Sequence, residues 1–224
     1  MKKLIYTVTC VLFLIGLIIG IVEFRAYDRS FYASEYAKLE TYEYIGISEE
    51  DLKETTDVLL SYMEGKRDDM VVYATINNKE REVFNEREKL HMIDVVELIR
   101  MADLIKYVSY GLMALVLCVV YSKKDYREFG KSILRAVGVL IVILGAIGLF
   151  VAIDFNLFWT YFHLVFFDND LWLLNPRTDV MIQMFPEEFF KDVVIQIVAI
   201  AVSSITLIAG LGFALSRKKD SVYN

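Results

Sequence analysis

The sequence predicts an integral membrane protein that is mainly α-helical, a four-transmembrane-helix bundle with a small extracytoplasmic α+β cap. Three observations carry this prediction. Hydrophobic residues make up 56% of the 224 residues, more than one soluble core of this size can bury. Four apolar runs are each long enough to cross a bilayer. Basic residues gather beside one set of run ends and are sparse beside the other, as the positive-inside rule describes.

The first apolar run, residues 4–22, follows two lysines and contains no charged residue. At about 1.5 Å per residue it spans roughly 28 Å, so we expect a first transmembrane helix within residues 1–22. A cleaved signal peptide is the alternative, but the residues after Val22 do not form a small-residue cleavage site. Gly16 and Gly20 make a GxxxG spacing that would let another helix approach closely.

Three further transmembrane helices are expected over residues 104–121, 136–153 and 193–215. The predicted loop 122–135 and tail 216–224 share one side with the N-terminus. That side holds the basic residues Lys2, Lys3, Lys123, Lys124, Arg127, Lys131, Arg135, Arg217, Lys218 and Lys219. The positive-inside rule therefore places both termini in the cytoplasm. The extracytoplasmic parts are then a cap, residues 23–103, and an aromatic-rich segment, residues 154–192.

The charge of the cap restricts the possible partners. Residues 23–103 carry 11 basic and 20 acidic side chains, a net charge of −9, which argues against nucleic acid and against tight binding to anionic headgroups. The two cysteines, Cys10 and Cys118, both fall inside predicted spans. We therefore expect no disulfide in the cap, and lipid-facing thiols in the bundle.

Within the cap the sequence predicts short elements. Aromatic residues recur over 24–44, either as rings resting at the level of the lipid headgroups or as a small core of the cap itself. Ser48 is an expected helix N-cap, and Gly65 an expected stop. Residues 70–76 and 81–84 read as two strands of a hairpin that turns at two asparagines.

Asn85 predicts a second helix start, because Glu88 three residues later completes a capping box. This helix carries His91 on an apolar stripe and runs on into the second span. Continued straight, it would hold His91 roughly 20 Å beyond the hydrocarbon. We expect a tilt or a break that lays the stripe on the interface and brings His91 down to it.

His91 and His163 are the two histidines of the chain, and both fall in predicted extracytoplasmic segments that flank spans. Imidazole can take and return a proton near neutral pH, so a pair at one membrane boundary suits general acid and base catalysis. A zinc site is the rival interpretation, with a third ligand from Asp94, Asp168 or Asp170, although the spacing matches no zinc motif. Haem ligation is less favoured because neither histidine lies within a span.

Two blocks of sequence around these histidines resemble the bacterial lipoprotein intramolecular transacylases. The first is EREKLHMIDV, residues 86–95. The second is FHLVFFDNDLW, residues 162–172, continued by NPRTD at 175–179 and FPEEFF at 185–190. The plan of four spans with an extracytoplasmic cap is similar too, so the resemblance covers essentially the whole chain.

The resemblance implies a bacterial cytoplasmic membrane enzyme, multi-pass, with its active site on the extracytoplasmic face. It would transfer the sn-2 acyl chain of a diacylglyceryl-modified lipoprotein to the α-amino group of that molecule's own N-terminal cysteine, giving a lyso-form lipoprotein. His91 and His163 match the family's two catalytic histidines. No cofactor or metal is implied; the partners are the lipoprotein and membrane lipid, and nothing requires more than a monomer.

Neighbouring residues are candidates for substrate binding or orientation. Bulky rings could wall a confined space, carboxylates could orient an imidazole, and Arg87, Asn169 or a tyrosine hydroxyl could stabilise an oxyanion. The candidates are Arg87, Asp94, Tyr161, Phe162, Phe166, Asp168, Asn169, Asp170 and Trp172. The alternative function is a non-enzymatic membrane sensor or assembly subunit whose acidic cap binds a protein partner.

Overall fold

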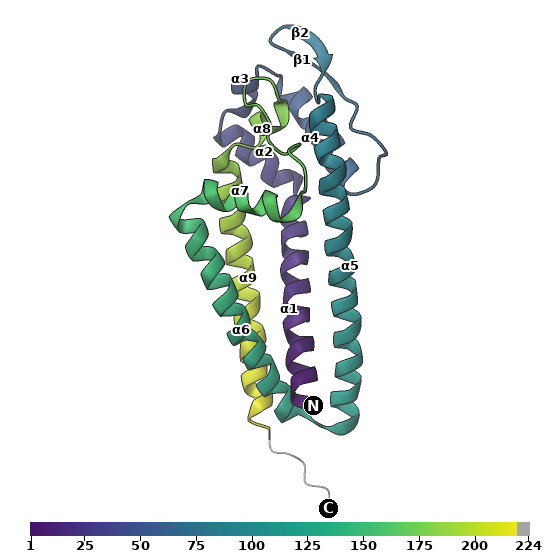
Figure 1. The fold of residues 1–224 in the computed structure, drawn as a ribbon, viewed down its shortest axis with the longest axis vertical. Helices are drawn as coiled ribbons and strands as arrows, with labels where there is room; N and C mark the ends of the chain where they lie inside the picture. The colour runs from purple at the N-terminus through teal and green to yellow at the C-terminus, as the bar shows by residue number, and fades with distance from the viewer. Residues whose placement is uncertain (219–224) are drawn as a thin grey trace, which may run out of the picture. The chain divides into compact units, whose positions relative to one another are not determined.

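The structure is a computed structural model that describes residues 1–218, and within them nine helices and two strands follow one another along the chain (Figure 1). In order they are α1 (Lys2–Ala26), α2 (Arg29–Lys38), α3 (Thr41–Ile45), α4 (Glu49–Met63), β1 (Tyr73–Ile76), β2 (Lys79–Glu82), α5 (Glu86–Lys123), α6 (Tyr126–Ile153), α7 (Phe155–Phe166), α8 (Val180–Met184) and α9 (Glu187–Ser216). They divide into two compact units. The bundle unit comprises residues 1–22, 101–158 and 197–218, and the hairpin unit comprises 23–100 and 159–196.

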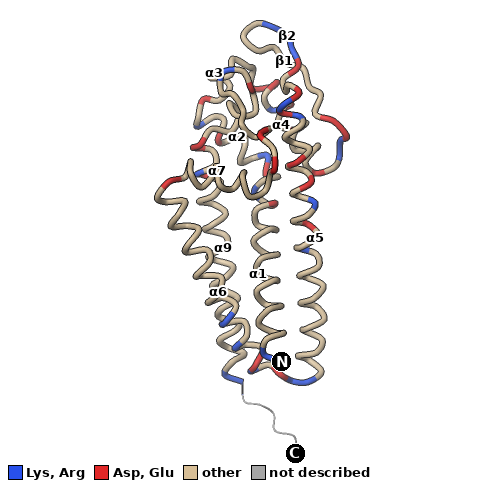
Figure 2. The backbone as a smooth tube through the Cα atoms, viewed as in Figure 1, with Lys and Arg blue, Asp and Glu red and all other residues tan. Residues whose placement is uncertain are grey.

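Four helices, α1, α5, α6 and α9, are long and apolar enough to cross a membrane, which confirms the four predicted spans. Figure 2 shows long stretches of each in which no residue is coloured as charged. The helices are longer than the apolar runs because they continue into polar residues at their ends. Large apolar side chains point outward from the bundle unit: Leu115, Val142 and Leu207 are 66%, 72% and 76% exposed. Such a surface is suited to lipid rather than water.

Small residues bring the helices of the bundle unit together. The Tyr110 hydroxyl on α5 donates a hydrogen bond of 3.1 Å to the carbonyl oxygen of Gly16 on α1. A Cβ at Gly16 would overlap the Ser109 hydroxyl, so the expected close approach at the GxxxG spacing is observed. Cys10 is buried in the packed interior of the bundle, whereas Cys118 is exposed. The expectation of two lipid-facing thiols is therefore wrong for Cys10.

Basic segments meet at one end of the bundle unit, where Figure 2 shows blue and red segments beside the N-terminus. The ammonium of Lys2 lies 2.8 Å from the carboxylate of Asp125 in the α5–α6 turn. Lys218, after α9, lies 4.8 Å from the centre of the Tyr126 ring. The N-terminus, the α5–α6 turn and the end of α9 thus share one end, as the charge pattern predicts. Lys219 and the rest of the predicted tail 216–224 beyond residue 218 lie outside the described residues.

The hairpin unit is mainly helical, so the predicted α+β character rests on two four-residue strands. The antiparallel register pairs Tyr73 with Glu82 and Ile76 with Lys79. Asn77 and Asn78 adopt φ values of 51° and 62°, the left-handed conformation of a two-residue hairpin turn. The first strand is shorter than the predicted 70–76. The second has the predicted length but covers 79–82 rather than 81–84, because the two-residue turn leads directly into it.

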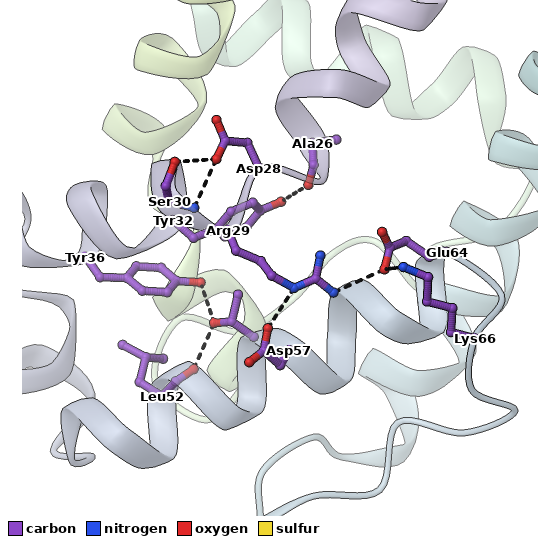
Figure 3. Close-up of polar contacts among 11 residues, drawn as sticks. Ala26, Asp28, Arg29, Ser30, Tyr32, Tyr36, Leu52, Asp57, Glu64 and Lys66 are labelled. Atoms are coloured by element: carbon purple, nitrogen blue, oxygen red, sulfur yellow. Dashed lines mark hydrogen bonds and ion pairs between the residues drawn. The ribbon is translucent and has the colours of Figure 1, made fainter.

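Aromatic side chains of α2 form part of the core of the hairpin unit. Phe31, Tyr32 and Tyr36 are buried, and the ring centroids of Phe31 and Tyr32 lie 5.2 Å and 5.3 Å from that of Phe189 on α9. The Thr56 hydroxyl on α4 contacts the Tyr36 hydroxyl at 3.2 Å (Figure 3). Of the two interpretations of these aromatic residues, the packed core is therefore correct for these three.

Exposed ion pairs join α2 to α4 and the turn after it. Arg29 contacts Asp57 at 2.8 Å and Glu64 at 3.1 Å, and Glu64 also pairs with Lys66 (Figure 3). Exposed pairs of this kind contribute about 0–1 kcal/mol each, so the buried rings are the larger source of stability.

α5 is one continuous helix of 38 residues. The break that we considered between its amphipathic start and its apolar continuation is absent. Its first glycine is Gly111, it contains no proline, and its backbone hydrogen bonds are uninterrupted, so nothing in the sequence kinks it. The predicted capping box is present: the Asn85 side chain accepts from the backbone N–H groups of Arg87 and Glu88, and the Glu88 carboxylate accepts from that of Asn85.

Candidate active site

The two histidines come together inside the hairpin unit. His91 lies in the second turn of α5 and His163 in the last turn of α7, and their ring centroids are 6.1 Å apart. Both are almost completely buried, with 8% and 6% of their surfaces exposed. Two segments that are distant in the sequence therefore place two imidazoles within the span of one small headgroup.

Aromatic rings surround His163. The Trp172 ring stacks on the imidazole at 4.7 Å with an interplanar angle of 27°, and Trp159 meets it edge to face at 4.9 Å. Phe167 lies 5.5 Å from His163 and 5.3 Å from His91, so it contacts both imidazoles. The ring centroid of Phe162 lies 5.4 Å from that of His163. The imidazoles thus lie in a largely apolar enclosure.

A backbone contact selects the tautomer of His163. Its Nδ1 lies 2.7 Å from the carbonyl oxygen of Trp159, one helical turn earlier. A carbonyl can only accept, so Nδ1 carries the proton of the neutral ring and Nε2 presents a lone pair. In His91, by contrast, Nδ1 is buried without a hydrogen-bond partner among the described residues. A buried, unpaired nitrogen costs free energy unless a ligand or water pairs with it.

The enclosure keeps both imidazoles neutral. Burial, followed by the neighbouring His163 and the charge of Arg87, lowers the pKa of His91 from 6.5 to about 4, with Asp94 acting in the opposite direction. Burial also lowers the pKa of His163, and its hydrogen bond to Trp159 partly offsets this. A neutral imidazole can accept a proton, and the imidazolium that results is a strong proton donor in this environment.

The loop that carries Trp172 is tied to α5 by polar contacts. Asn169 donates to the Asp94 carboxylate at 2.8 Å, and Arg87 bonds to the Asp170 backbone carbonyl and lies 3.2 Å from the Asp170 carboxylate. The Trp172 indole N–H donates to the carbonyl of Asn169 at 3.0 Å. These four polar candidates therefore contact one another in two pairs, Asn169 with Asp94 and Arg87 with Asp170. The pairs hold the loop so that the ring of Trp172 lies over His163.

The remaining predicted site residues lie further from the imidazoles or face outward. Phe166 packs on Phe162 with a centroid distance of 4.9 Å, but Tyr161 and Phe166 are 52% and 51% exposed. Asp168 is also exposed. Among the described residues, no group of three or more histidine, cysteine or acidic side chains is arranged to hold a metal ion.

The predicted site residues omit five that the structure brings close. Trp159 and Phe167 each lie one turn from His163, so their spacing of four residues could have identified them. Asn85, Glu88 and Asp179 form a hydrogen-bonded cluster in which the two carboxylates are buried, and Glu88 lies one helical turn from His91. The capping box indicated Asn85 and Glu88 as local structure only, and nothing in the sequence connected them to Asp179.

Comparison with known proteins decides the family. The family model described as lipoprotein intramolecular transacylase Lit matches residues 7–190. The chain belongs to this family. It is therefore a membrane enzyme, an intramolecular transacylase that acts on lipoproteins, and the resemblance seen at the two histidine blocks is confirmed.

Solved structures agree with this assignment at the level of the fold. The integral membrane lipoprotein intramolecular transacylase Lit from Bacillus cereus superposes with a TM-score of 0.79 at 22% identity, covering 96% of this chain and 94% of that one. Two structures of the same protein, with one histidine replaced by arginine or by alanine, give TM-scores of 0.74 and 0.73 at 20% identity. They cover 96% of this chain and 90% and 91% of theirs. The search of curated proteins found no match.

Proposed function

We propose that this Lit-family enzyme transfers the sn-2 acyl chain of a diacylglyceryl lipoprotein to the α-amino group of the same molecule's N-terminal cysteine, with His91 and His163 as acid and base. The observation that carries the proposal is the pair of buried imidazoles 6.1 Å apart. Membership of an enzyme family leaves no reason to retain the non-enzymatic sensor.

Each imidazole has one task in this reaction. A protonated α-amine has a pKa of about 7.7 to 8 and must lose a proton before its nitrogen can attack. The attack of the neutral amine forms the C–N bond and a tetrahedral intermediate, and the bond between the acyl carbon and the glyceryl oxygen then breaks. The nitrogen gives up one proton as the amide forms, and the glyceryl oxygen takes up one proton as it leaves. The lone pair on Nε2 of His163 suits proton removal, and a neighbouring imidazole suits proton return.

Confinement supplies the rest of the catalysis. Amine and ester belong to one molecule, so holding them about 3 to 3.5 Å apart is an orientation effect that can supply roughly 7 to 11 kcal/mol. The rings around His163 limit the entry of water, which would otherwise hydrolyse the ester. Arg87 and Asn169 remain candidates for the oxyanion site, provided that substrate replaces their contacts to the loop and to Asp94.

We further propose that both termini are cytoplasmic and that residues 23–103 and 154–192 face the outer side of the membrane. The charge pattern supports this arrangement, since the basic residues gather at the end of the bundle unit that holds the N-terminus. A lipoprotein with its lipid in the outer leaflet would then present its amine and its ester to the histidines together.

A lipoprotein with different acyl chains at sn-1 and sn-2 tests the reaction. After incubation with the purified enzyme in lipid, mass spectrometry of the N-terminal peptide should find the sn-2 chain on nitrogen and the sn-1 chain still on the glyceryl group. The sn-1 chain on nitrogen would refute the proposed position. Mixing two isotopically distinct lipoproteins should yield no exchanged products.

Removal of the Trp172 ring is expected to admit water. In Trp172→Ala the stacked cover of His163 is lost, so part of the ester should be hydrolysed rather than transferred. The ratio of free fatty acid to N-acylated product should rise at least several-fold, measured by mass spectrometry. Trp172→Phe, which retains an aromatic plane, is the matched control. An unchanged ratio in Trp172→Ala would show that the ring does not exclude water.

A further inference from the structure

Glu88 is fully buried, and its two oxygens bind two different parts of the chain. One oxygen accepts from the backbone N–H of Asn85 at 2.7 Å, which closes the capping box of α5. The other accepts from the backbone N–H of Met181 in α8 at 2.6 Å, 93 residues further along the chain. Of these two contacts, a capping box requires only the first. The second contact and the burial are additional features.

Asp179 reinforces the same connection. Its carboxylate accepts from the backbone N–H of Asn175 at 2.7 Å, from the Thr178 hydroxyl at 2.7 Å and from the Asn85 side-chain amide at 2.9 Å. We call the set Asn85, Glu88, Asp179 and Met181 the carboxylate clasp. Through it the start of α5 and the segment 175–181 are hydrogen-bonded to each other at two points, from Asn85 to Asp179 and from Met181 to Glu88.

The members of the clasp flank the two histidines along the chain, because Asn85 and Glu88 precede His91 whereas Asp179 and Met181 follow His163. Glu88 and His91 are three residues apart on α5, so they share one face of the helix at a separation of about 5–6 Å between Cβ atoms. The segment held by Met181 and Asp179 follows His163 and includes Trp172, which stacks on His163. A shift of α5 past this segment would move His91 relative to His163 and to Trp172.

We propose that Glu88 is a positioning residue of the transacylase: through the carboxylate clasp it holds His91 in register with His163 and Trp172. The proposal rests on the proposed roles of the two histidines. Glu88 itself does not touch either imidazole in the described contacts, and it acts through the helix that it shares with His91.

The protonation state of Glu88 provides a test. Burial raises the pKa of this carboxyl from 4.5 to about 7; the negative charge of Asp179 also raises it, while the two backbone donors and Arg81 on β2 lower it. The ionised carboxylate can accept both backbone N–H groups. The neutral acid keeps one strong acceptor, so protonation weakens one of the two contacts.

A purely structural role predicts the opposite pH dependence. The folded-state pKa of Glu88 lies above its unfolded value, so its contribution to stability is greatest at low pH and is lost as pH rises through about 7. Glu88→Gln stays uncharged, so an effect on stability alone would make the variant more stable than the wild type at high pH. Loss of the positioning of His91 would instead lower the activity of the variant relative to the wild type at high pH.

The experiment compares the acyl-transfer rate of full-length Glu88→Gln with that of the wild type from pH 5.5 to 8.5. At pH 8.5 we expect kcat of the variant to be about tenfold lower with KM changed less than twofold. Near pH 5.5, where Glu88 of the wild type is protonated, the ratio should approach one. Titration of the substrate amine affects both proteins equally and cancels in the ratio. Glu97→Gln, at an exposed position of the same helix, should match the wild type throughout.

The outcomes separate the possibilities. A ratio that is constant with pH, or that moves in favour of the variant at high pH, would overturn the positioning role. Should Glu88→Gln not fold, Asp179→Asn provides a second test. Loss of the Asp179 charge lowers the pKa of Glu88, so the activity of this variant relative to wild type should rise as pH falls below 7. A flat or falling ratio would contradict the proposal. Failure of the two-histidine mechanism would show separately, as activity in the histidine variants.

Discussion

Alanine in place of His163 or His91 is expected to reduce acyl transfer at least 100-fold. General acid and base catalysis contributes about 10² to 10⁴ to a rate, and each imidazole has one proton to move. Because the steps are sequential, either substitution alone should stop the reaction, and the double variant should be little worse than each single one. Mass spectrometry of the N-terminal peptide of a co-expressed lipoprotein measures the result directly.

Two controls make this result specific to proton transfer. His163→Asn retains an N–H donor toward the Trp159 carbonyl but has no basic nitrogen, so it should fold like the wild type and remain inactive. A chelator should leave the wild-type rate unchanged if catalysis needs no metal. Retained N-acylation in either alanine variant would refute the two-histidine mechanism, and loss of activity with chelator would favour the zinc interpretation.

The four spans could be predicted from the sequence because a bilayer imposes a length and an apolar composition on each helix separately. The hairpin was predicted with shifted ends, since its register depends on how Asn77 and Asn78 turn and not on the strand residues alone. The break that we considered in α5 is absent, because an apolar stripe indicates which surface a helix covers but does not bend the helix. A helix bends where its backbone hydrogen bonds are locally interrupted.

The two histidines could be selected as candidates because few residue types move protons near neutral pH and the chain has two of this type; their catalytic role stays a prediction. The contacts of the polar residues near the histidines were harder to predict. Arg87, Asp94, Asn169 and Asp170 are placed together, yet they contact one another rather than the imidazoles. The bond from Met181 to Glu88 could not be predicted, since a backbone N–H is present at nearly every residue and carries no sequence signal.

Leucine in place of Gly16 is expected to destabilise the folded enzyme. A Cβ at this position would overlap the Ser109 hydroxyl and lie 3.2 Å from the Tyr110 ring, so the larger side chain must separate α1 from α5. Separation also breaks the bond from the Tyr110 hydroxyl to the Gly16 carbonyl. Overpacking of this kind costs about 1–3 kcal/mol, and the lost hydrogen bond adds about 1 kcal/mol.

Gly111→Leu is the matched control, because a Cβ at Gly111 on α5 meets no atom within 4 Å. Both variants add the same side chain to an apolar helix, so they differ only in what surrounds it. Thermal unfolding in detergent should show a clearly lower melting temperature for Gly16→Leu and little change for Gly111→Leu. Acyl transfer should fall in proportion to the folded fraction of Gly16→Leu, since Gly16 and the two imidazoles belong to different compact units. Equal melting temperatures for the two variants would show that the close contact at Gly16 is not needed for stability.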